Sequence, residues 1–216
     1  MKWTSNLAYA VGLLTTDGNL SKDGRHLELT SKDIEQLNNF KKCLGLKVAI
    51  TWKTSGYSRG DKKYPRVQFG NVRLYKWLLK IGLMPNKTKI ISNVKIPDKY
   101  FFDFLRGHFD GDGYLYFYFD KRWKKSFLFY LNFISASPRH ISWLRFTLKR
   151  LLGIKGHLNH SNKGVIVLRY AKTESKKILK RMYFGKNMIC LQRKYKKVRK
   201  AFKINAEVEK LVNSQP

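Results

Sequence analysis

Two aspartates at matched places in the chain are the residues that could do chemistry together. Asp17 and Asp112 each precede a glycine and end an apolar stretch with an internal glycine, Gly12 or Gly107, five residues earlier. If the stretches are helices that pack through these glycines, the two carboxylates come close together, and their repulsion is tolerable only with a cation between them. The spacing therefore predicts a divalent metal site shared by Asp17 and Asp112.

Other interpretations of these acids must be weighed. An Asp-Gly step after a helix is commonly only a turn. The Asp-Gly-Asp-Gly segment at residues 110–113 also resembles the start of a calcium-binding loop, but Tyr114 and Lys121 stand where that loop needs ligands. The matched pair favours a metal site over a turn, and the missing ligands exclude an EF-hand. We expect Asp110 to be a hydrogen-bonding residue at the helix end.

The composition indicates a partner of opposite charge. Lys and Arg number 45 against 14 Asp and Glu, which gives a formal net charge of +31 on 216 residues. Such a balance favours nucleic acid, although ribosomal proteins and proteins that bind anionic membranes are also basic. Hydrophobic residues make up 43% of the chain, so we expect a folded core rather than a disordered basic tail.

Targeting and cysteine patterns favour an intracellular protein. No apolar run approaches the roughly 18 residues of a membrane span, and the first residues carry no signal-peptide pattern. Cys43 and Cys190 stand far apart without Cys or His at ligand spacing, so we expect two reduced thiols and no structural zinc. His157 and His160 lack further ligands and are expected at the surface or facing DNA.

The hydrophobic pattern is that of a diverged tandem repeat in which each half runs helix, two strands, helix, two strands, helix. After the first Asp-Gly step, the predicted elements lie at residues 26–30, 30–45, 47–54, 64–69 and 72–81. After the second, they lie at residues 114–120, 127–135, 137–151, 156–159, 165–170 and 173–182. Residues 84–99 link the two halves. Residues 191–202 and the tail that continues to residue 216 follow the second half and have no counterpart in the first. Thr30 and Asp33 have the spacing of a helix capping box.

With two such motifs, 95 positions apart in a basic chain of this repeat order, the sequence resembles a single-chain LAGLIDADG homing endonuclease. The motif at residues 105–113 keeps the family's glycine, both acids and the closing glycine, whereas the motif at residues 10–18 has Thr15 where the earlier acid often stands. The resemblance covers roughly residues 5–202. It implies an α+β fold of two pseudo-symmetric αββαββα repeats, each with a four-stranded antiparallel sheet, that form a DNA-binding saddle around a central helix pair. The first repeat with its linker would span residues 1–96, and the second, with a C-terminal helical extension, residues 97–216.

The resemblance also implies a catalytic centre that needs no covalent nucleophile. Its predicted members are the metal ligands Asp17 and Asp112, the adjacent Thr16 and Gly111, and the helix-interface residues Gly12 and Gly107. Two or more Mg²⁺ ions suit the oxygen ligands, and Mn²⁺ would substitute. The family places a Lys or Arg after the last helix of each repeat, which implies Lys87 and Arg193, with Lys89 and Lys194 as alternatives.

DNA contacts are expected on the free faces of the two sheets, because alternate strand residues point toward a ligand there. The candidates in the first half are Ser21, Asp23, Arg25, Glu28, Lys53, Arg66 and Gln68, and those in the second are Tyr116, Tyr118, Lys121, Arg122, Lys124, Asn132, Asn159 and Arg169. A curved four-stranded ribbon fits the major groove. The run at residues 114–119 is aromatic on both faces, so core packing competes there with DNA contact.

The activity implied by the resemblance is magnesium-dependent cleavage of double-stranded DNA at a long asymmetric site by a monomer. The gene would be free-standing or intron-encoded, because the chain lacks the splicing-domain ends of an intein. Two alternatives stay open: an RNA maturase that assists group I intron splicing, and a non-catalytic DNA-binding protein of the same fold. Retention of both Asp17 and Asp112 favours the enzyme.

Overall fold

The computed structural model describes residues 1–54, 62–123, 126–161, 164–185 and 187–213. The first half contains α1 (Ser5–Thr16), β1 (Gly18–Leu20), β2 (His26–Thr30), α2 (Ile34–Leu44), β3 (Thr51–Thr54), β4 (Lys63–Gly70) and α3 (Val72–Ile81). The short 3-10 helices η1 (Lys87–Lys89) and η2 (Asp98–Tyr100) follow. The second half contains α4 (Phe101–Asp112), β5 (Tyr114–Phe119), β6 (Phe127–Ser135), α5 (Pro138–Leu152), β7 (His157–His160), β8 (Ile166–Tyr170), α6 (Lys172–Met182) and α7 (Gln192–Asn213).

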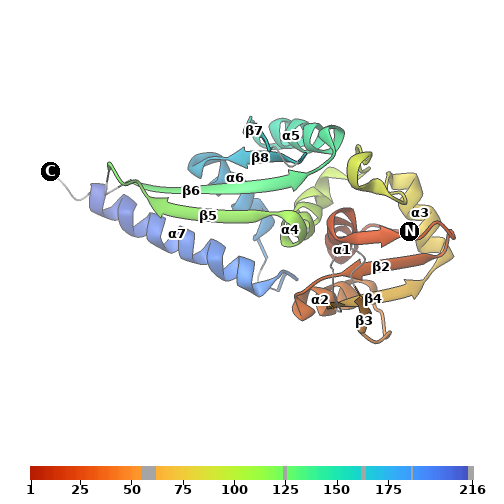
Figure 1. The fold of residues 1–216 in the computed structure, drawn as a ribbon. Coiled ribbons are helices and arrows are strands. Elements are labelled where there is room, and N and C mark those ends of the chain that lie inside the picture. The colour runs from red at the N-terminus through yellow and green to blue at the C-terminus, as the bar shows by residue number, and fades with distance from the viewer. Residues whose placement is uncertain (55–61, 124–125, 162–163, 186, 214–216) are drawn as a thin grey trace.

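Both halves have one topology. The strand order is β1-β2-β4-β3 in the first sheet and β5-β6-β8-β7 in the second, and all neighbours are antiparallel. Figure 1 shows α1 and α4 side by side between the two sheets, and α7 running along the long β5–β6 hairpin. The predicted α+β class, with two repeats that each carry a four-stranded antiparallel sheet, is confirmed.

Several predicted boundaries were wrong. Residues 18–20 form the short strand β1, residues 46–50 have no regular structure ahead of β3, and α7 continues to Asn213. The capping box does not form: Asp33 is the N-cap of α2 but makes no side-chain cap hydrogen bond. Its carboxylate instead pairs with Arg193 at 2.6 Å, an attachment between the two halves that the local sequence does not encode.

The central helix pair explains the low amphipathicity of the first motif. The hydrophobic residues of α1 from Ala8 to Leu14 are at most 1% exposed, as expected for a helix surrounded by protein on all sides. A Cβ atom on Gly12 would lie 2.6 Å from the His108 amide nitrogen, and one on Gly107 would lie 3.2 Å from the Gly12 Cα. Glycine at both positions therefore permits backbone contact between α1 and α4.

In the part of the chain that the structure describes, helices cover one face of each sheet and leave the other face free of helices. Phe129 of β6 packs on Phe202 of α7, with ring centroids 6.3 Å apart, and Phe133 packs on His108 of α4 at 5.9 Å. Tyr130 and Asn132, at the alternate positions, point to the opposite face, because successive strand residues alternate. None of the described helices is long and apolar enough to cross a membrane.

Candidate active site

The two aspartates of the motifs lie where α1 and α4 meet. Asp17 caps the C-terminus of α1, and Asp112 is the last residue of α4. A Cβ atom on Gly111 would lie 3.0 Å from the Asp17 Oδ2 atom and would collide with the Thr16 side chain. The close helix contact therefore brings the carboxyl group of Asp17 against the end of the partner helix, next to Asp112.

The local environment disfavours two negative charges. Burial, together with the nearby Asp112 carboxylate, raises the pKa of Asp17 to about 6. Asp112 is more exposed, yet surrounding protein raises its pKa as well. Gln36 opposes this effect by donating a 2.9 Å hydrogen bond to Asp17 Oδ2, which favours the ionised form. A bound cation would relieve the same charge accumulation.

Two buried lysines flank the aspartates in equivalent ways. Lys87, in η1, is 6% exposed and donates a hydrogen bond to the carbonyl oxygen of Gly18. Lys194, in the first turn of α7, is 8% exposed and donates to the carbonyl oxygen of Gly113 at 2.7 Å. Since Gly18 and Gly113 follow the two aspartates, the lysines occupy matching positions in the two repeats.

The charge state of these lysines depends on the aspartates. Burial lowers the pKa of Lys87 to about 8, against the opposing effects of Asp17 and Asp112. The pKa of Lys194 is also lowered to about 8, mainly by burial, while Asp110, Asp17 and Asp112 raise it. Near neutral pH both ammonium groups are mostly charged, and they offset the carboxylates.

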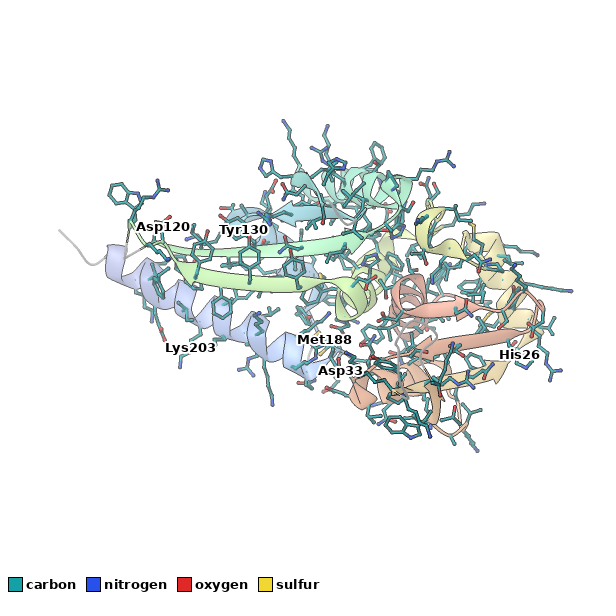
Figure 2. The ribbon with its side chains drawn as sticks, in the orientation of Figure 1. His26, Asp33, Asp120, Tyr130, Met188 and Lys203 are labelled. Atoms are coloured by element: carbon teal, nitrogen blue, oxygen red, sulfur yellow. The ribbon has the colours of Figure 1, made fainter. Side chains whose placement is uncertain are left out.

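Of the two candidates for the second basic residue, the structure favours Lys194, the alternative that the sequence left open, over Arg193. Lys194 lies within 3.0 Å of four carbonyl oxygens at the end of α4, those of Phe109, Asp110, Gly111 and Gly113. Arg193 pairs instead with the Asp33 carboxylate at 2.6 Å, and its side chain is 59% exposed. Figure 2 shows Asp33 near the start of α7. Lys89 is exposed as well. Adjacent helix residues point about 100° apart, so only one of the two can face the site.

The remaining motif residues have structural contacts. Asp110 is buried and accepts hydrogen bonds at 2.7 Å from the Tyr9 hydroxyl and the Leu191 amide, as expected for a hydrogen-bonding helix-end residue. Thr15 stands at the equivalent position and donates to the Val11 carbonyl at 2.7 Å. Thr16 likewise donates to the Leu13 carbonyl of its own helix at 3.1 Å.

The donor set fits a hard divalent cation. Among the described residues, no group of three or more His, Cys, Asp or Glu side chains gathers as a metal site. Asp17 and Asp112 would therefore hold an ion together with backbone oxygens, water or a ligand's phosphate oxygens. Carboxylates without nitrogen or sulfur donors suit Mg²⁺ better than Zn²⁺.

The candidate DNA contacts of the first sheet form a cluster of ion pairs. Glu28 is 6% exposed and accepts hydrogen bonds of 2.7 Å from Lys53 and from Arg66. Burial would raise the Glu28 pKa, but the two hydrogen bonds outweigh it and lower that pKa. The Glu28 carboxylate is thus already hydrogen-bonded to Lys53 and Arg66, and its contact with DNA stays a prediction. Gln68 is exposed beside this cluster.

The turn between β1 and β2 holds the other three candidates of the first half. Asp23 accepts hydrogen bonds from the backbone amides of Arg25 and His26 and from the His26 ring, which lower its pKa to about 2. It therefore fixes the turn, although its side chain is 47% exposed. Arg25 is exposed, and Ser21 is half-buried.

In the second sheet the free face carries the predicted Tyr116, Tyr118, Asn159 and Arg169. Asn132 lies on this face but is 0% exposed, and its Oδ1 atom accepts a 3.2 Å hydrogen bond from Arg169. Direct contact of Asn132 with DNA stays a prediction that would need Arg169 to move. Lys121 and Arg122 are exposed in the β5–β6 turn, and Lys124 lies outside the described residues.

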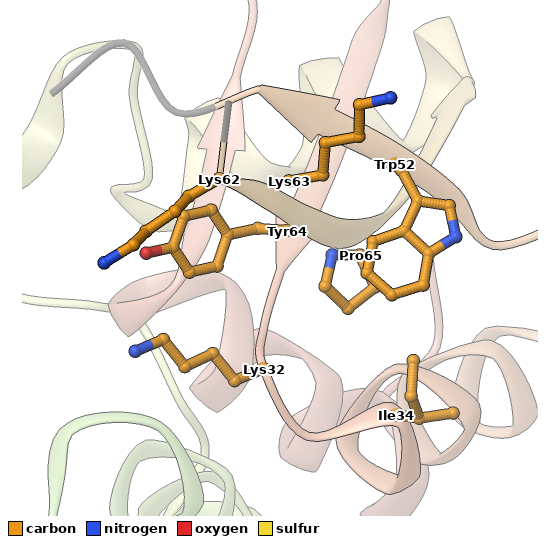
Figure 3. A pocket seen from close by; sticks show the side chains of 7 residues that line it. All are labelled: Lys32, Ile34, Trp52, Lys62, Lys63, Tyr64 and Pro65. Atoms are coloured by element: carbon orange, nitrogen blue, oxygen red, sulfur yellow. The ribbon is translucent and has the colours of Figure 1, made fainter. Parts of the chain in front are cut away.

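A hollow of about 470 Å³ lies at the edge of the first sheet rather than at the aspartates. Figure 3 shows that Trp52 and Tyr64 of β3 and β4 line it, with Lys32 and Ile34 opposite. The Lys32 ammonium lies 5.5 Å from the centroid of the Tyr64 ring. The described residues that line the hollow include no acid, so they offer no carboxylate for a metal ion.

Comparison with solved structures identifies the fold. The chain is similar to the LAGLIDADG homing endonuclease I-GzeII in complex with its DNA target, with 13% identity over 99% of this chain and 94% of that chain and a TM-score of 0.60. It is also similar to I-SmaMI bound to uncleaved DNA in the presence of calcium ions, with 12% identity, coverage of 100% and 95%, and a TM-score of 0.59. Full-length DUF199/WhiA from Thermatoga maritima matches with 13% identity and a TM-score of 0.58, over 99% of this chain and 66% of that longer chain.

No family model and no curated protein matches the chain in sequence. The structural similarity therefore shows the fold: this protein has the two-repeat LAGLIDADG fold.

Proposed function

We propose that the protein is a sequence-specific endonuclease that hydrolyses both strands of a DNA duplex with Mg²⁺. The observation that carries this proposal is the repeated constellation at the end of the helix pair. Each repeat supplies one aspartate and one buried lysine that donates to the carbonyl of the next glycine, Gly18 or Gly113. Two equivalent half-sites suit the cleavage of a duplex, because each of its two antiparallel DNA strands presents one phosphodiester bond to be cut.

Asp17 and Asp112 would hold the metal. A bound divalent cation supplies an activated water and stabilises charge on the phosphate and leaving oxygens. Lys87 and Lys194 hold the ends of the motifs in place through the glycine carbonyls and add positive charge beside the scissile groups. With pKa values of about 8, each lysine is also suited to exchange a proton near neutral pH.

The sheets would bind the DNA on either side of this centre. The net charge of +31 favours a polyanion, and the solved neighbours I-GzeII and I-SmaMI are bound to DNA. Lys53, Arg66 and Gln68 offer donors to base edges in one half. Because one chain supplies two non-identical sheets, a monomer would recognise an asymmetric site.

The main alternative is a protein that binds nucleic acid without cutting it. It would be either a DNA-binding protein or a maturase that binds a group I intron RNA. The constellation argues for catalysis, because neither alternative needs four ionisable groups with shifted pKa values at one point. The same proposal includes a gene that is free-standing or intron-borne, and an active site in which Mn²⁺ can replace Mg²⁺.

The test is selection of cleaved molecules from a partially randomised duplex library in magnesium. The proposal expects one consensus, cut on both strands and uncut in EDTA. Asp98→Asn is the matched control, because Asp98 is an exposed aspartate paired with Arg150 on the surface, and this variant should select the same consensus. Recovery of no cut consensus by the unmodified chain would overturn the proposal.

A further inference from the structure

The free faces of the two sheets differ in chemistry although their strands are equivalent. Register alignment places Asn19, Glu28 and Gln68 in one row across β1, β2 and β4. The equivalent row across β5, β6 and β8 consists of Tyr114, Asn132 and Arg169. Tyrosines replace polar side chains at the edge of the second sheet, and this difference continues along β5.

Four tyrosines form a ladder on the second sheet. Tyr114, Tyr116 and Tyr118 follow each other at alternate positions of β5, with neighbouring ring centroids 6.1 and 6.2 Å apart and interplanar angles of 21° and 3°. Tyr130 of β6, visible at the middle of the sheet in Figure 2, stacks on Tyr116 at 5.1 Å. Tyr114 and Tyr118 remain 36% and 45% exposed.

Arg169 contacts both the tyrosine rings and the sheet beneath them. Its guanidinium carbon lies 5.6 Å from the ring centroids of both Tyr116 and Tyr130. The same side chain donates to the buried Asn132 at 3.2 Å, and Asn132 in turn donates to the Tyr130 carbonyl at 3.2 Å. The rings are thus held in fixed orientations, and Arg169 is a positioning residue for them.

The packing of the rings disfavours the stacking of bases on Tyr116. Proteins that bind single strands stack bases on free aromatic faces. Here Tyr116 is flanked by Tyr114, Tyr118 and Tyr130, so its faces are occupied within the ladder. The ladder presents ring edges and phenol groups, which suit the floor of a duplex groove.

The duplex feature that matches apolar ring edges is the C5-methyl group of thymine, the one apolar group in the major groove. Leu128, Ile134 and Val167 share the free face, and they add apolar surface beside the tyrosines. Rings about 6 Å apart along β5 are separated by about two base-pair steps of roughly 3.4 Å each.

We propose that the tyrosine ladder of the second sheet reads thymine methyl groups, so that the half-site under this sheet is thymine-rich, whereas the half-site under the first sheet is read by hydrogen bonds. This inference rests on the proposed function, because it takes a specific DNA duplex as the ligand. Lys121 and Arg122, exposed at the β5–β6 turn, lie beyond the ladder, where they would contact phosphates.

The test replaces thymine by deoxyuridine, which removes only the methyl group, in one half of the selected duplex at a time. The half under the second sheet is identified with 5-iodouracil, which should photocrosslink to Tyr116 or Tyr118. Deoxyuridine in that half should weaken binding by roughly fourfold per contacted methyl group, and in the other half it should have little effect. The sensitive positions should be two base pairs apart.

Substitutions in the protein test whether the tyrosine ladder causes the sensitivity to deoxyuridine. Tyr118→Ala should abolish the sensitivity to deoxyuridine at one of the sensitive positions, whereas Tyr118→Phe should retain it at all of them. Arg66→Ala, on the first sheet, should weaken binding but leave the sensitivity unchanged. Tight binding that ignores deoxyuridine in both halves, with an intact consensus, would overturn this inference and leave the endonuclease proposal standing. Absence of any specific duplex would overturn both.

Discussion

Lys194 donates a 2.7 Å hydrogen bond to the carbonyl oxygen of Gly113, the residue that directly follows Asp112. The equivalent contact in the first repeat joins Lys87 to Gly18, which follows Asp17. The two lysines reach these carbonyls from unrelated elements, a short 3-10 helix and the start of a 22-residue helix. The repeated contact therefore marks the site as a pair of matched half-sites.

The first prediction compares substitutions of Lys194 and of the adjacent Arg193. Lys194→Met should abolish cleavage and destabilise the fold by about 1.5–3 kcal/mol, because several carbonyls at the end of α4 lose a charged donor. Arg193→Ala should retain cleavage, since it removes an exposed ion pair worth about 0–1 kcal/mol. Cleavage rates and thermal melts check both variants, and the reverse pattern would place Arg193 in the site.

The second prediction concerns the helix interface. Gly107→Ala should destabilise the protein by about 1–3 kcal/mol, because its Cβ atom would lie 2.9 Å from the Tyr9 carbonyl carbon and closer still to its oxygen. Gly12→Ala should behave alike, whereas Gly185→Ala, with no atom within 4 Å of the added carbon, should melt as the parent does. Equal melting of all three variants would contradict the close contact of α1 and α4.

The sequence predicted the repeat, the sheets and the adjacency of the two aspartates, because these follow from hydrophobic periodicity and two aligned motifs. It could not separate Arg193 from Lys194. The offset of 95 residues that relates the motifs would place the partner of Lys87 at residue 182, a methionine, so the repeat gives no register there. The packing of α7 determines whether Arg193 or Lys194 points toward the two aspartates.

The sequence also could not predict which side chains on the free faces of the sheets are buried. Alternation correctly assigned Glu28 and Asn132 to the free faces, but each is covered by longer neighbours. Lys53 and Arg66 close over Glu28, and Arg169 with the tyrosines closes over Asn132. Such cross-strand contacts depend on the pairing register, which single strands do not encode.

The third prediction is a pH dependence. The pKa of Asp17 is raised to about 6, so protons compete with the cation below that pH, and ionised Asp17 is fully available above pH 7. The cleavage rate at subsaturating magnesium should therefore fall by up to about tenfold per pH unit below pH 6. Asp23→Asn is a control, because the pKa of Asp23 is already about 2, and its profile should match the parent's. A rate that stays flat from pH 7 to pH 5 would contradict this assignment.

The fourth prediction distinguishes DNA from RNA as the partner. The selected duplex should bind at least about 10³-fold more tightly than random duplex or folded group I intron RNA at one salt concentration. Salt dependence alone is uninformative, because the charge of +31 gives a steep slope with either polymer. Equal or tighter binding to intron RNA, without a magnesium-dependent DNA cut, would assign the protein to the maturases.

The most direct measurement is double-strand cleavage of the selected duplex by Asp17→Asn and by Asp112→Asn in magnesium, with binding measured in parallel in calcium. Each variant keeps the shape of the side chain but removes one metal-binding charge. Double-strand cleavage should fall by at least about 10²-fold in each variant, since loss of even an outer contact to a metal ligand costs about 10–100-fold, while binding in calcium persists. Cutting at the parent's rate by either variant would contradict the assignment of the two aspartates as the catalytic metal ligands.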